Sequence, residues 1–258
     1  MKVVIFAGGL GTRISEETEV RPKPMVEIGG KPILWHIMKL YSQYGHNDFI
    51  ICLGYKGYMI KEYFMNYYLH NSDITIGLSD NKVDVHYSFT ESFNVTLVET
   101  GLSTKTAGRL QKVQKYIGQE DFMLTYGDGV ANVDLDELIQ FHRKHGKIAT
   151  VTAVRPEARF GAMEITREGE VKNFKEKPLG DGKWINGGFF VLSPRVFKYL
   201  QGPMNEVMWE DAPMEQLANE GELMAYKHED FWKCMDALRD KIELENLWQN
   251  QQAKWKTW

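Results

Sequence analysis

Uninterrupted apolar runs alternate with amphipathic stretches from the start of the chain through residue 154. The run Val3–Ala7 has no polar break, which is typical of a strand buried on both faces of a sheet. In Ile33–Tyr44, apolar residues recur at helical spacing between Pro32 and Gly45, which favour a helix start and a helix end. The same patterns predict further strands and helices in turn at Phe49–Leu53, Lys56–Leu69, Val95–Val98, Thr106–Ile117, Phe122–Tyr126, Leu135–His145 and Ala149–Val154. This alternation predicts a parallel sheet covered by helices.

Residues 73–89 break this rhythm. Val83, Val85 and Tyr87 alternate with polar residues, and a polar turn at residues 80–82 precedes them. The pattern predicts a hairpin that projects from the sheet. It serves either as an edge extension or as a subunit contact, and the pattern does not separate the two.

Beyond Phe160 the chain changes to shorter elements. Strands are predicted at Val171–Lys177 and Gly187–Leu192, and helices near Pro194–Leu200, Pro213–Asn219 and Leu238–Trp248. The fold class is therefore α/β, with a Rossmann-like doubly wound mixed sheet flanked by helices. We expect a single domain over residues 1–258, in which residues 1–155 form the core and residues 156–258 form a smaller α+β region.

Composition narrows the possible partners. The formal net charge is −4 over 258 residues, whereas binding to nucleic acid or to an anionic membrane needs a basic surface. No run approaches the ~18 apolar residues that a membrane span needs. The two cysteines, Cys52 and Cys234, form no CxxC pair and are typical of reduced thiols. We expect a cytoplasmic protein that handles a polyanion, if it binds one, with a few local cations and a metal.

A glycine-rich turn directly follows the first predicted strand. Its sequence is Ala7-Gly8-Gly9-Leu10-Gly11-Thr12-Arg13. Glycines allow a tight turn that aims backbone N–H groups at a phosphate chain. Ile14 stands where the dinucleotide fingerprint needs Gly or Ala, and no Gly-Lys-Ser/Thr follows as in a Walker A loop. What remains is a phosphate loop that ends in an arginine, or else an ordinary tight connection.

A lysine with unusual flanks follows this turn. Lys23 lies between Pro22 and Pro24, whose rings fix the backbone on both sides. A stiff support suits a cation that must meet phosphates in one position. A solvated loop lysine would not need such flanks.

These segments together resemble the sugar-1-phosphate nucleotidyltransferases. The glycine turn through Arg13 and Lys23-Pro24-Met25 resemble the family signature, and the remaining motifs occur in the family's order. They are Tyr126-Gly127-Asp128, Phe174-Lys175-Glu176-Lys177-Pro178 and Asn186-Gly187-Gly188. Within the family, the likeness runs essentially end to end with the branch that uses CTP and glucose 1-phosphate.

The resemblance implies roles for individual residues. Catalysis would rest on Arg13, Lys23 and Asp128. The nucleotide would contact Ala7, Gly8, Gly9, Gly11, Thr12, Arg13, Lys23, Thr104, Arg109 and Asp128. The sugar phosphate would contact Glu176, Lys177, Asn186 and Gly187. Mg²⁺ would be held by Asp128 and Asp236, because this hard cation prefers carboxylate oxygens.

The resemblance also implies a homo-oligomer, with a hexamer as one candidate, and a product that feeds deoxysugar synthesis for surface polysaccharide. From the residues alone, Asp236 would be read as a helix N-cap before Leu238. His142 and His145 would lie on a solvated helix face. The tryptophans Trp248, Trp255 and Trp258 favour packing or an oligomer contact.

Three alternatives stay open. The first is a sibling enzyme that uses UTP, dTTP or GTP, or another sugar phosphate. The second is a non-catalytic regulatory relative, although this chain keeps Arg13, Lys23, Asp128 and Lys177 together. The third is a nicotinamide-dependent dehydrogenase, against which the glycine spacing argues.

Overall fold

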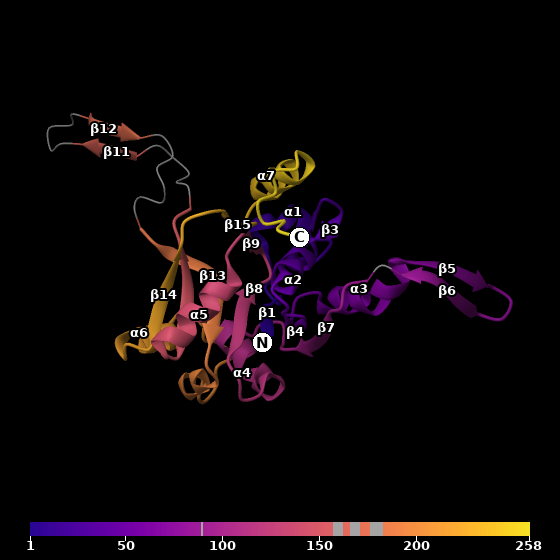
Figure 1. The fold of residues 1–258 in the computed structure, drawn as a ribbon, viewed down its shortest axis with the longest axis horizontal. Helices are drawn as coiled ribbons and strands as arrows, with labels where there is room; N and C mark the ends of the chain where they lie inside the picture. Colours follow the sequence, from indigo (N-terminus) through magenta and orange to yellow (C-terminus); the bar gives the residue numbers. More distant parts are fainter. Residues whose placement is uncertain (89, 157–161, 166–170, 176–182) are drawn as a thin grey trace.

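A seven-stranded mixed sheet forms the centre of the computed structural model (Figure 1). The structure describes every residue except 89, 157–161, 166–170 and 176–182. The strand order is β14 (Leu223–His228), β10 (Ala149–Val154), β13 (Ile185–Leu192), β8 (Phe122–Tyr126), β1 (Lys2–Phe6), β4 (Asp48–Leu53) and β7 (Asn94–Glu99). Strand β13 is antiparallel to both of its neighbours, and the other adjacent pairs are parallel. The mixed doubly wound sheet predicted from the sequence is confirmed.

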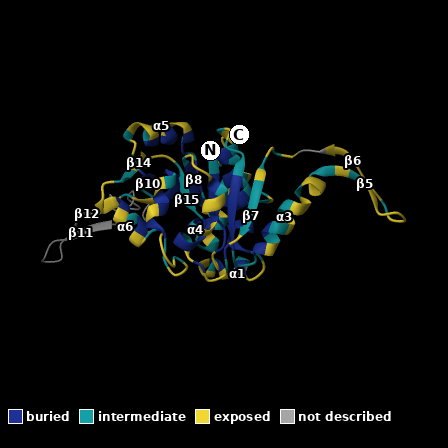
Figure 2. Cartoon of the chain, turned by 90° about the horizontal axis from the view of Figure 1, so that it is seen from below, coloured by how far each residue is buried: buried dark blue, intermediate teal, exposed yellow. Residues whose placement is uncertain are grey.

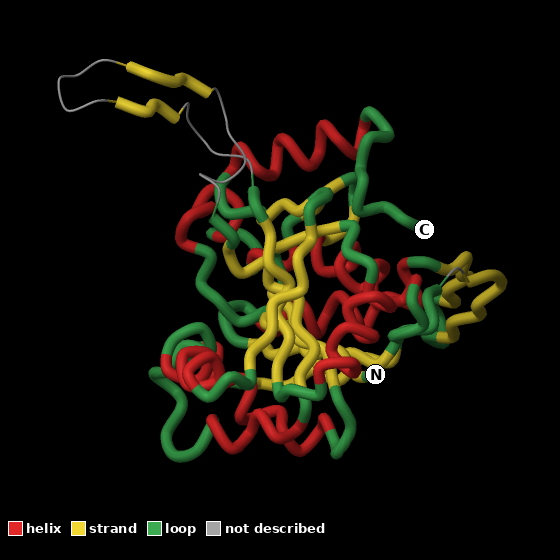
Figure 3. Tube along the Cα trace, turned by 60° about the vertical axis from the view of Figure 1, so that its left-hand side comes forward, coloured by secondary structure: helices red, strands yellow, loops and turns green. Residues whose placement is uncertain are grey.

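Helices cover both faces of this sheet (Figure 3). Alternate residues of β1 enter two separate cores, with Val3 and Ile5 in one and Val4 and Phe6 in the other. The first core is covered by α2 (Ile33–Gln43), α5 (Leu135–His145) and α7 (Leu238–Gln249). The second is covered by α4 (Thr106–Ile117), α6 (Ala212–Asn219) and the 3₁₀ helix η4 (Pro194–Tyr199). Continuous apolar strands arise because both faces of the sheet are buried.

Two hairpins lie outside this sheet. Strands β5 (Ser72–Gly77) and β6 (Lys82–Ser88) pair antiparallel and follow α3 (Gly57–His70), as the alternating pattern predicts. They extend away from the body, and most of their length is exposed (Figure 2). Strands β11 (Ala162–Ile165) and β12 (Val171–Lys175) form the second pair. The last two residues of the predicted strand Val171–Lys177 lie outside the described residues.

Short elements link the glycine turn to the first long helix. They are the 3₁₀ helix η1 (Thr12–Ile14), α1 (Ser15–Thr18), the 3₁₀ helix η2 (Lys23–Met25) and the strand pair β2 (Glu27–Ile28) and β3 (Lys31–Pro32). A further pair joins β9 (Gly129–Ala131) to β15 (Trp232–Cys234). The pairing of β9 with β15 places the segment before α7 beside the end of β8. No helix in the described part of the chain is long and apolar enough to cross a membrane.

The prediction for His142 is wrong. Its side chain is buried against β10, and both His142 and His145 contact the Thr150 hydroxyl at 2.8 and 2.7 Å. Burial lowers the pKa of His142 to about 4. The helix was correctly placed, but its two histidines contact a threonine on the sheet, while Arg143 and Lys144 between them are exposed.

An aromatic cluster fastens the C-terminal residues to the body. Trp255 is buried and stacks on Phe231 at 5.5 Å, and Trp248 packs edge-on against His36 at 4.8 Å. The indole of Trp258 lies 5.8 Å from that of Trp35. The predicted packing role of these tryptophans is confirmed within one chain.

We expect the turn between β2 and β3 to tolerate alanine at only one of its two glycines. Gly29 and Gly30 both have positive φ, 59° and 74°. A Cβ at Gly29 would lie 2.0 Å from the Trp248 indole nitrogen, whereas Gly30 has open space. Gly30→Ala should lower the free energy of unfolding by about 1 kcal/mol, the usual cost of a left-handed non-glycine residue. Gly29→Ala should lower it by about 2–4 kcal/mol because the indole must also move.

Urea denaturation of both variants measures this difference. Equal losses would contradict close packing of α7 on the turn.

Candidate active site

A cleft of about 510 Å³ opens at the carboxyl ends of β1 and β8. In α/β sheets this edge is where ligands bind. All ten residues predicted to contact a nucleotide line it: Ala7, Gly8, Gly9, Gly11, Thr12, Arg13, Lys23, Thr104, Arg109 and Asp128. Segments that are about 100 residues apart in the chain therefore meet at one site.

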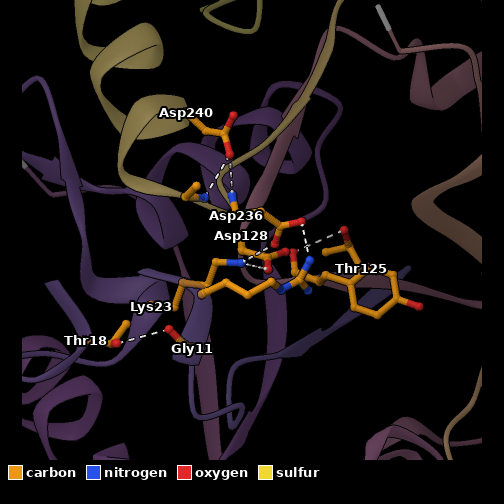
Figure 4. Close-up of polar contacts among 10 residues, drawn as sticks. Gly11, Thr18, Lys23, Thr125, Asp128, Asp236 and Asp240 are labelled. Atoms are coloured by element: carbon orange, nitrogen blue, oxygen red, sulfur yellow. Dashed lines mark hydrogen bonds and ion pairs between the residues drawn. The ribbon is translucent and has the colours of Figure 1, made fainter. Parts of the chain in front are cut away.

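The glycine turn forms one wall of this cleft. Gly11 has φ +66°, and its carbonyl accepts a hydrogen bond from the Thr18 hydroxyl at 3.1 Å (Figure 4). A Cβ at Gly8 would lie 2.0 Å from a terminal nitrogen of Arg109. Glycine is thus required at Gly11 by its backbone angle and at Gly8 by the close approach of the guanidinium.

Arg109 holds this turn to its surroundings. It is buried, and its Nη1 donates to the Leu53 carbonyl at 2.9 Å and to the Thr100 hydroxyl at 2.6 Å. Its Nη2 donates to the Gly8 carbonyl at 2.9 Å and to the Leu102 carbonyl at 3.4 Å. Both terminal nitrogens therefore have acceptors within the protein, and they tie the glycine turn to β4 and to the loop that carries Thr104.

Lys23 reaches between two carboxylates (Figure 4). Its Nζ donates to Asp128 at 2.6 Å and to Asp236 at 2.8 Å. Burial alone lowers the pKa of Lys23, but the charge of Asp128 and the hydrogen bonds to both carboxylates raise it overall. Arg13 is mostly exposed and also contacts Asp236, at 2.8 Å. The site therefore holds two cations and two carboxylates in contact.

Each of these charges is placed by local structure. Pro22 is extended, and the 3₁₀ turn η2 starts at Lys23, with Met25 N donating to the Pro22 carbonyl at 2.8 Å. Asp128 follows β8, and its carbonyl accepts from Met235 N at 2.9 Å. This bond draws the segment of Asp236 against the end of β8.

Asp236 is not the cap of α7. The carboxylate of Asp240 instead accepts from the backbone N–H groups of Asp236 and Ala237, at 3.0 and 2.8 Å (Figure 4). The side chain of Asp236 is therefore free to face Lys23. Burial alone raises the pKa of Asp236, but its hydrogen bond with Lys23 and the nearby cations lower it overall.

The same place could hold a metal ion. One ligand atom each of Asp128, Cys234 and Asp236 lies within 4.8 Å of the others. Burial raises the pKa of the Cys234 thiol, and sulfur is a softer ligand than a hard cation such as Mg²⁺ prefers. Two carboxylate oxygens remain, and such a donor set suits a hard divalent cation.

Of the predicted sugar-side residues, the structure describes Asn186 and Gly187, and neither is in the lining of the cleft. Asn186 is exposed near the start of β13, and its amide nitrogen is 3.4 Å from the Tyr126 hydroxyl. Gly187 is buried, and its carbonyl accepts from the Trp232 indole at 2.7 Å. A Cβ there would lie 2.8 Å from Val154, so packing against β10 requires a glycine. Glu176 and Lys177 lie outside the described residues.

Comparison with known proteins agrees with this geometry. The nucleotidyl transferase family model matches residues 2–248. The chain belongs to this family. A glucose-1-phosphate cytidylyltransferase from Salmonella typhimurium is 58% identical to this nucleotidyltransferase and covers 100% of both chains. A probable glucose-1-phosphate cytidylyltransferase from Bacillus subtilis is 48% identical over 100% of both chains.

A solved structure shares the fold. It is a putative glucose-1-phosphate thymidylyltransferase from Bacillus anthracis in complex with sucrose, with a TM-score of 0.68 and 20% identity. The match covers 96% of this nucleotidyltransferase and 94% of that chain. At this identity the likeness concerns the fold alone.

Sequence reasoning missed several polar residues in this nucleotidyltransferase's cleft, among them Tyr126 and Glu210. Tyr126 was quoted only as part of a motif, and Glu210 was not singled out, yet both line the cleft and hydrogen-bond to each other. Glu210 lies between recognisable elements, in a segment with no motif. Only its position three residues before Pro213, at the start of a predicted helix, could have drawn attention to it.

The two arginines of this nucleotidyltransferase's cleft should differ in their effect on stability. Arg109→Met removes the four hydrogen bonds of a buried guanidinium, and each such bond contributes about 0.5–1.5 kcal/mol. We expect a loss of more than about 2 kcal/mol in the free energy of unfolding.

Arg13→Met is the matched control. The Arg13 side chain is 75% exposed, and exposed ion pairs contribute about 0–1 kcal/mol. Chemical denaturation compares the two variants, and an equal loss in both would show that Arg109 does not tie the loops together.

Proposed function

We propose that this chain transfers the cytidylyl group of CTP to α-D-glucose 1-phosphate, giving CDP-glucose and pyrophosphate. The observation that carries this proposal is the contact of Lys23 with Asp128 and Asp236 beside the glycine turn. It places the glycine turn, Lys23 and Asp128 in the lining of one cleft, with the carboxylate of Asp236 in contact with Lys23. The 58% identical Salmonella protein, named a glucose-1-phosphate cytidylyltransferase, supports the choice of both substrates.

The reaction is a direct displacement. A phosphate oxygen of glucose 1-phosphate attacks the α-phosphorus of CTP, and the bond from that phosphorus to the bridging oxygen of the β-phosphate breaks. The attacking oxygen is already anionic at neutral pH, so no general base is needed. The chain's contribution is positioning and charge neutralisation. Backbone N–H groups of the glycine turn orient the triphosphate, and Arg13 and Lys23 stabilise the leaving pyrophosphate.

Magnesium is part of this proposal. Asp128 and Asp236 would hold the ion, which supplies positive charge between two anionic substrates. One oxygen of each carboxylate lies within 4.8 Å of the other, which supports a shared cation. The carboxylates would pass from contact with Lys23 and Arg13 to contact with the metal, and both cations would then be available to the phosphates.

The remaining roles follow the family signature. Lys177 and Glu176 would hold the phosphate and hydroxyls of the sugar, together with Asn186 and Gly187, and Thr104 would meet the nucleotide. We further propose that the protein acts in the cytoplasm and that CDP-glucose feeds deoxysugar synthesis for surface polysaccharide.

A homo-oligomer, with a hexamer as one candidate, is also part of the proposal. Exposed apolar side chains on α3 and the β5–β6 hairpin support it, among them Met65 at 79% and Leu78 at 88% exposure. Sedimentation velocity distinguishes a hexamer from a monomer.

Removing either charge of the central contact should nearly abolish turnover. Loss of one such electrostatic contact costs about 2.7–4 kcal/mol, roughly a hundred- to thousand-fold in kcat. We expect at least this decrease for Lys23→Ala and for Asp128→Asn, measured by pyrophosphate release at saturating substrates.

Lys241→Ala and Asp230→Asn are matched controls. Lys241 pairs with Glu17, Asp230 pairs with Lys254, and none of these residues lines the cleft. Near-normal turnover of either cleft variant, with its circular dichroism unchanged, would refute the assigned roles.

Substrate identity needs its own experiment. A panel of CTP, UTP, dTTP and GTP with several sugar 1-phosphates, with and without Mg²⁺, measures pyrophosphate release. We expect the highest kcat/KM with CTP and glucose 1-phosphate, and none without a divalent ion. Preference for another nucleotide would favour a sibling activity, and no turnover with any pair would favour a regulatory relative.

A further inference from the structure

A chain of hydrogen bonds crosses the cleft from the sugar side to the nucleotide side. It starts at Asn186, whose amide nitrogen lies 3.4 Å from the Tyr126 hydroxyl. The Tyr126 hydroxyl in turn donates to one carboxylate oxygen of Glu210. Tyr126 ends β8, Asn186 lies near the start of β13, and Glu210 precedes α6, so the chain joins three separate elements.

The far end of this chain reaches α4. The second carboxylate oxygen of Glu210 accepts from the Thr106 hydroxyl at 2.8 Å. The Thr106 oxygen accepts from Trp209 N at 2.7 Å. Thr106 is the first residue of α4, and it directly follows the loop that carries Thr104 into the cleft. Both oxygens of Glu210 are therefore committed to the protein rather than open to a ligand.

The direction of the hydrogen bonds is set by the charges. Burial, together with the charge of Glu210, raises the pKa of Tyr126, so its hydroxyl keeps its proton. A carboxylate only accepts, so the Tyr126 hydroxyl donates a hydrogen bond to Glu210 and accepts one from the Asn186 amide. The Asn186 oxygen accepts from Gly188 N at 2.8 Å. Both ends of the amide are thus specified, which excludes the flipped orientation.

The ring of Tyr126 is also held in place. It lies 5.9 Å from Phe6 and 6.2 Å from Phe190, centroid to centroid. Gly188 has φ +80°, and a Cβ there would lie 2.6 Å from the tyrosine ring. The ring packs between the sheet and this glycine, so removing the hydroxyl alone should leave the ring where it is.

We propose that Tyr126 and Glu210 are positioning residues for the sugar phosphate. They act through Asn186 by fixing the orientation of its amide at the edge of the cleft. The inference rests on the proposed function, because it takes Asn186 as a contact of the sugar. Neither residue touches a reacting atom in this account, so their loss should weaken binding of one substrate more than it slows the chemical step.

Tyr126→Phe tests this directly. It deletes one hydroxyl and leaves the packed ring, and a neutral hydrogen bond is worth roughly a five-fold change in an equilibrium constant. We expect the KM for glucose 1-phosphate to rise about five-fold or more, while the KM for CTP and kcat each change less than about two-fold.

Tyr199→Phe is the matched control. The Tyr199 hydroxyl also donates to a glutamate, Glu220, at 2.6 Å, and this pair lies outside the cleft lining. It should leave both KM values unchanged.

Glu210 supplies a second, independent variant. Glutamine can still accept from Tyr126 with its oxygen and donate to the Thr106 oxygen with its nitrogen, whereas leucine can do neither. Glu210→Leu should therefore raise the KM for glucose 1-phosphate at least as much as Tyr126→Phe, and Glu210→Gln should restore most of the loss. A structural defect alone would raise both KM values and lower the thermal midpoint.

The outcomes separate the inference from the function on which it rests. If the wild-type protein turns over CTP and glucose 1-phosphate but Tyr126→Phe leaves the ratio of the two KM values unchanged, the inference is overturned and the function stands. An equal rise of both KM values overturns it as well. If the wild-type protein does not turn over this pair, the proposed function fails and the inference fails with it.

Discussion

The contact of one lysine with two aspartates is the interaction on which the site depends. Lys23, Asp128 and Asp236 come from the start, middle and end of the chain, and no other contact in the cleft joins all three regions among the described residues. Ion pairs that are partly buried contribute little net stability, since the cost of removing charges from water offsets their attraction. Their value here is chemical. With Arg13 added, two positive charges balance two negative ones. In the proposed reaction, a metal and a triphosphate would replace these internal partners without isolating a charge.

The backbone around these charges is held in place, so the change of partners would involve only the charged side chains. Pro22 and the 3₁₀ turn at Lys23 stiffen one side, and the pairing of β9 with β15 stiffens the other. Between them, Arg109 fastens the glycine turn to the neighbouring loops. A rigid frame around a few mobile charges is what electrostatic catalysis needs, because donors that are already placed need no reorganisation during the reaction.

Many helices and strands can be predicted from the sequence, because the patterns that indicate them involve residues close together along the chain. Thr106–Ile117, Phe122–Tyr126, Leu135–His145 and Ala149–Val154 were predicted with the boundaries observed, since helical spacing and buried apolar runs depend only on neighbours. Strand β14 was missed because Leu223–His228 lies at the sheet edge, half exposed, and its apolar run ends after four residues at Lys227.

The wrong prediction for His142 has a different cause. His142 is buried because Thr150 on β10 lies opposite it, which no spacing along α5 reveals. From the residues alone Asp236 resembles a helix cap, but the structure shows that Asp240 holds the backbone there. The terminal nitrogens of Arg109 bond to protein acceptors, and its contact with a nucleotide stays a prediction. Thr150 lies only eight residues from His142, and Asp240 only four from Asp236, but the spacing does not show which side chains meet after folding. The resemblance to the family predicted which residues line the cleft, but only the structure shows which groups their side chains contact.

The most direct test of the central contact is a crystal structure of the protein with CTP and Mg²⁺ in the absence of sugar phosphate. The account predicts the triphosphate along the turn Gly8–Gly11, the metal on Asp128 and Asp236, and the Lys23 ammonium about 3 Å from a phosphate oxygen. A triphosphate bound elsewhere, with Lys23 still held by both carboxylates, would contradict it.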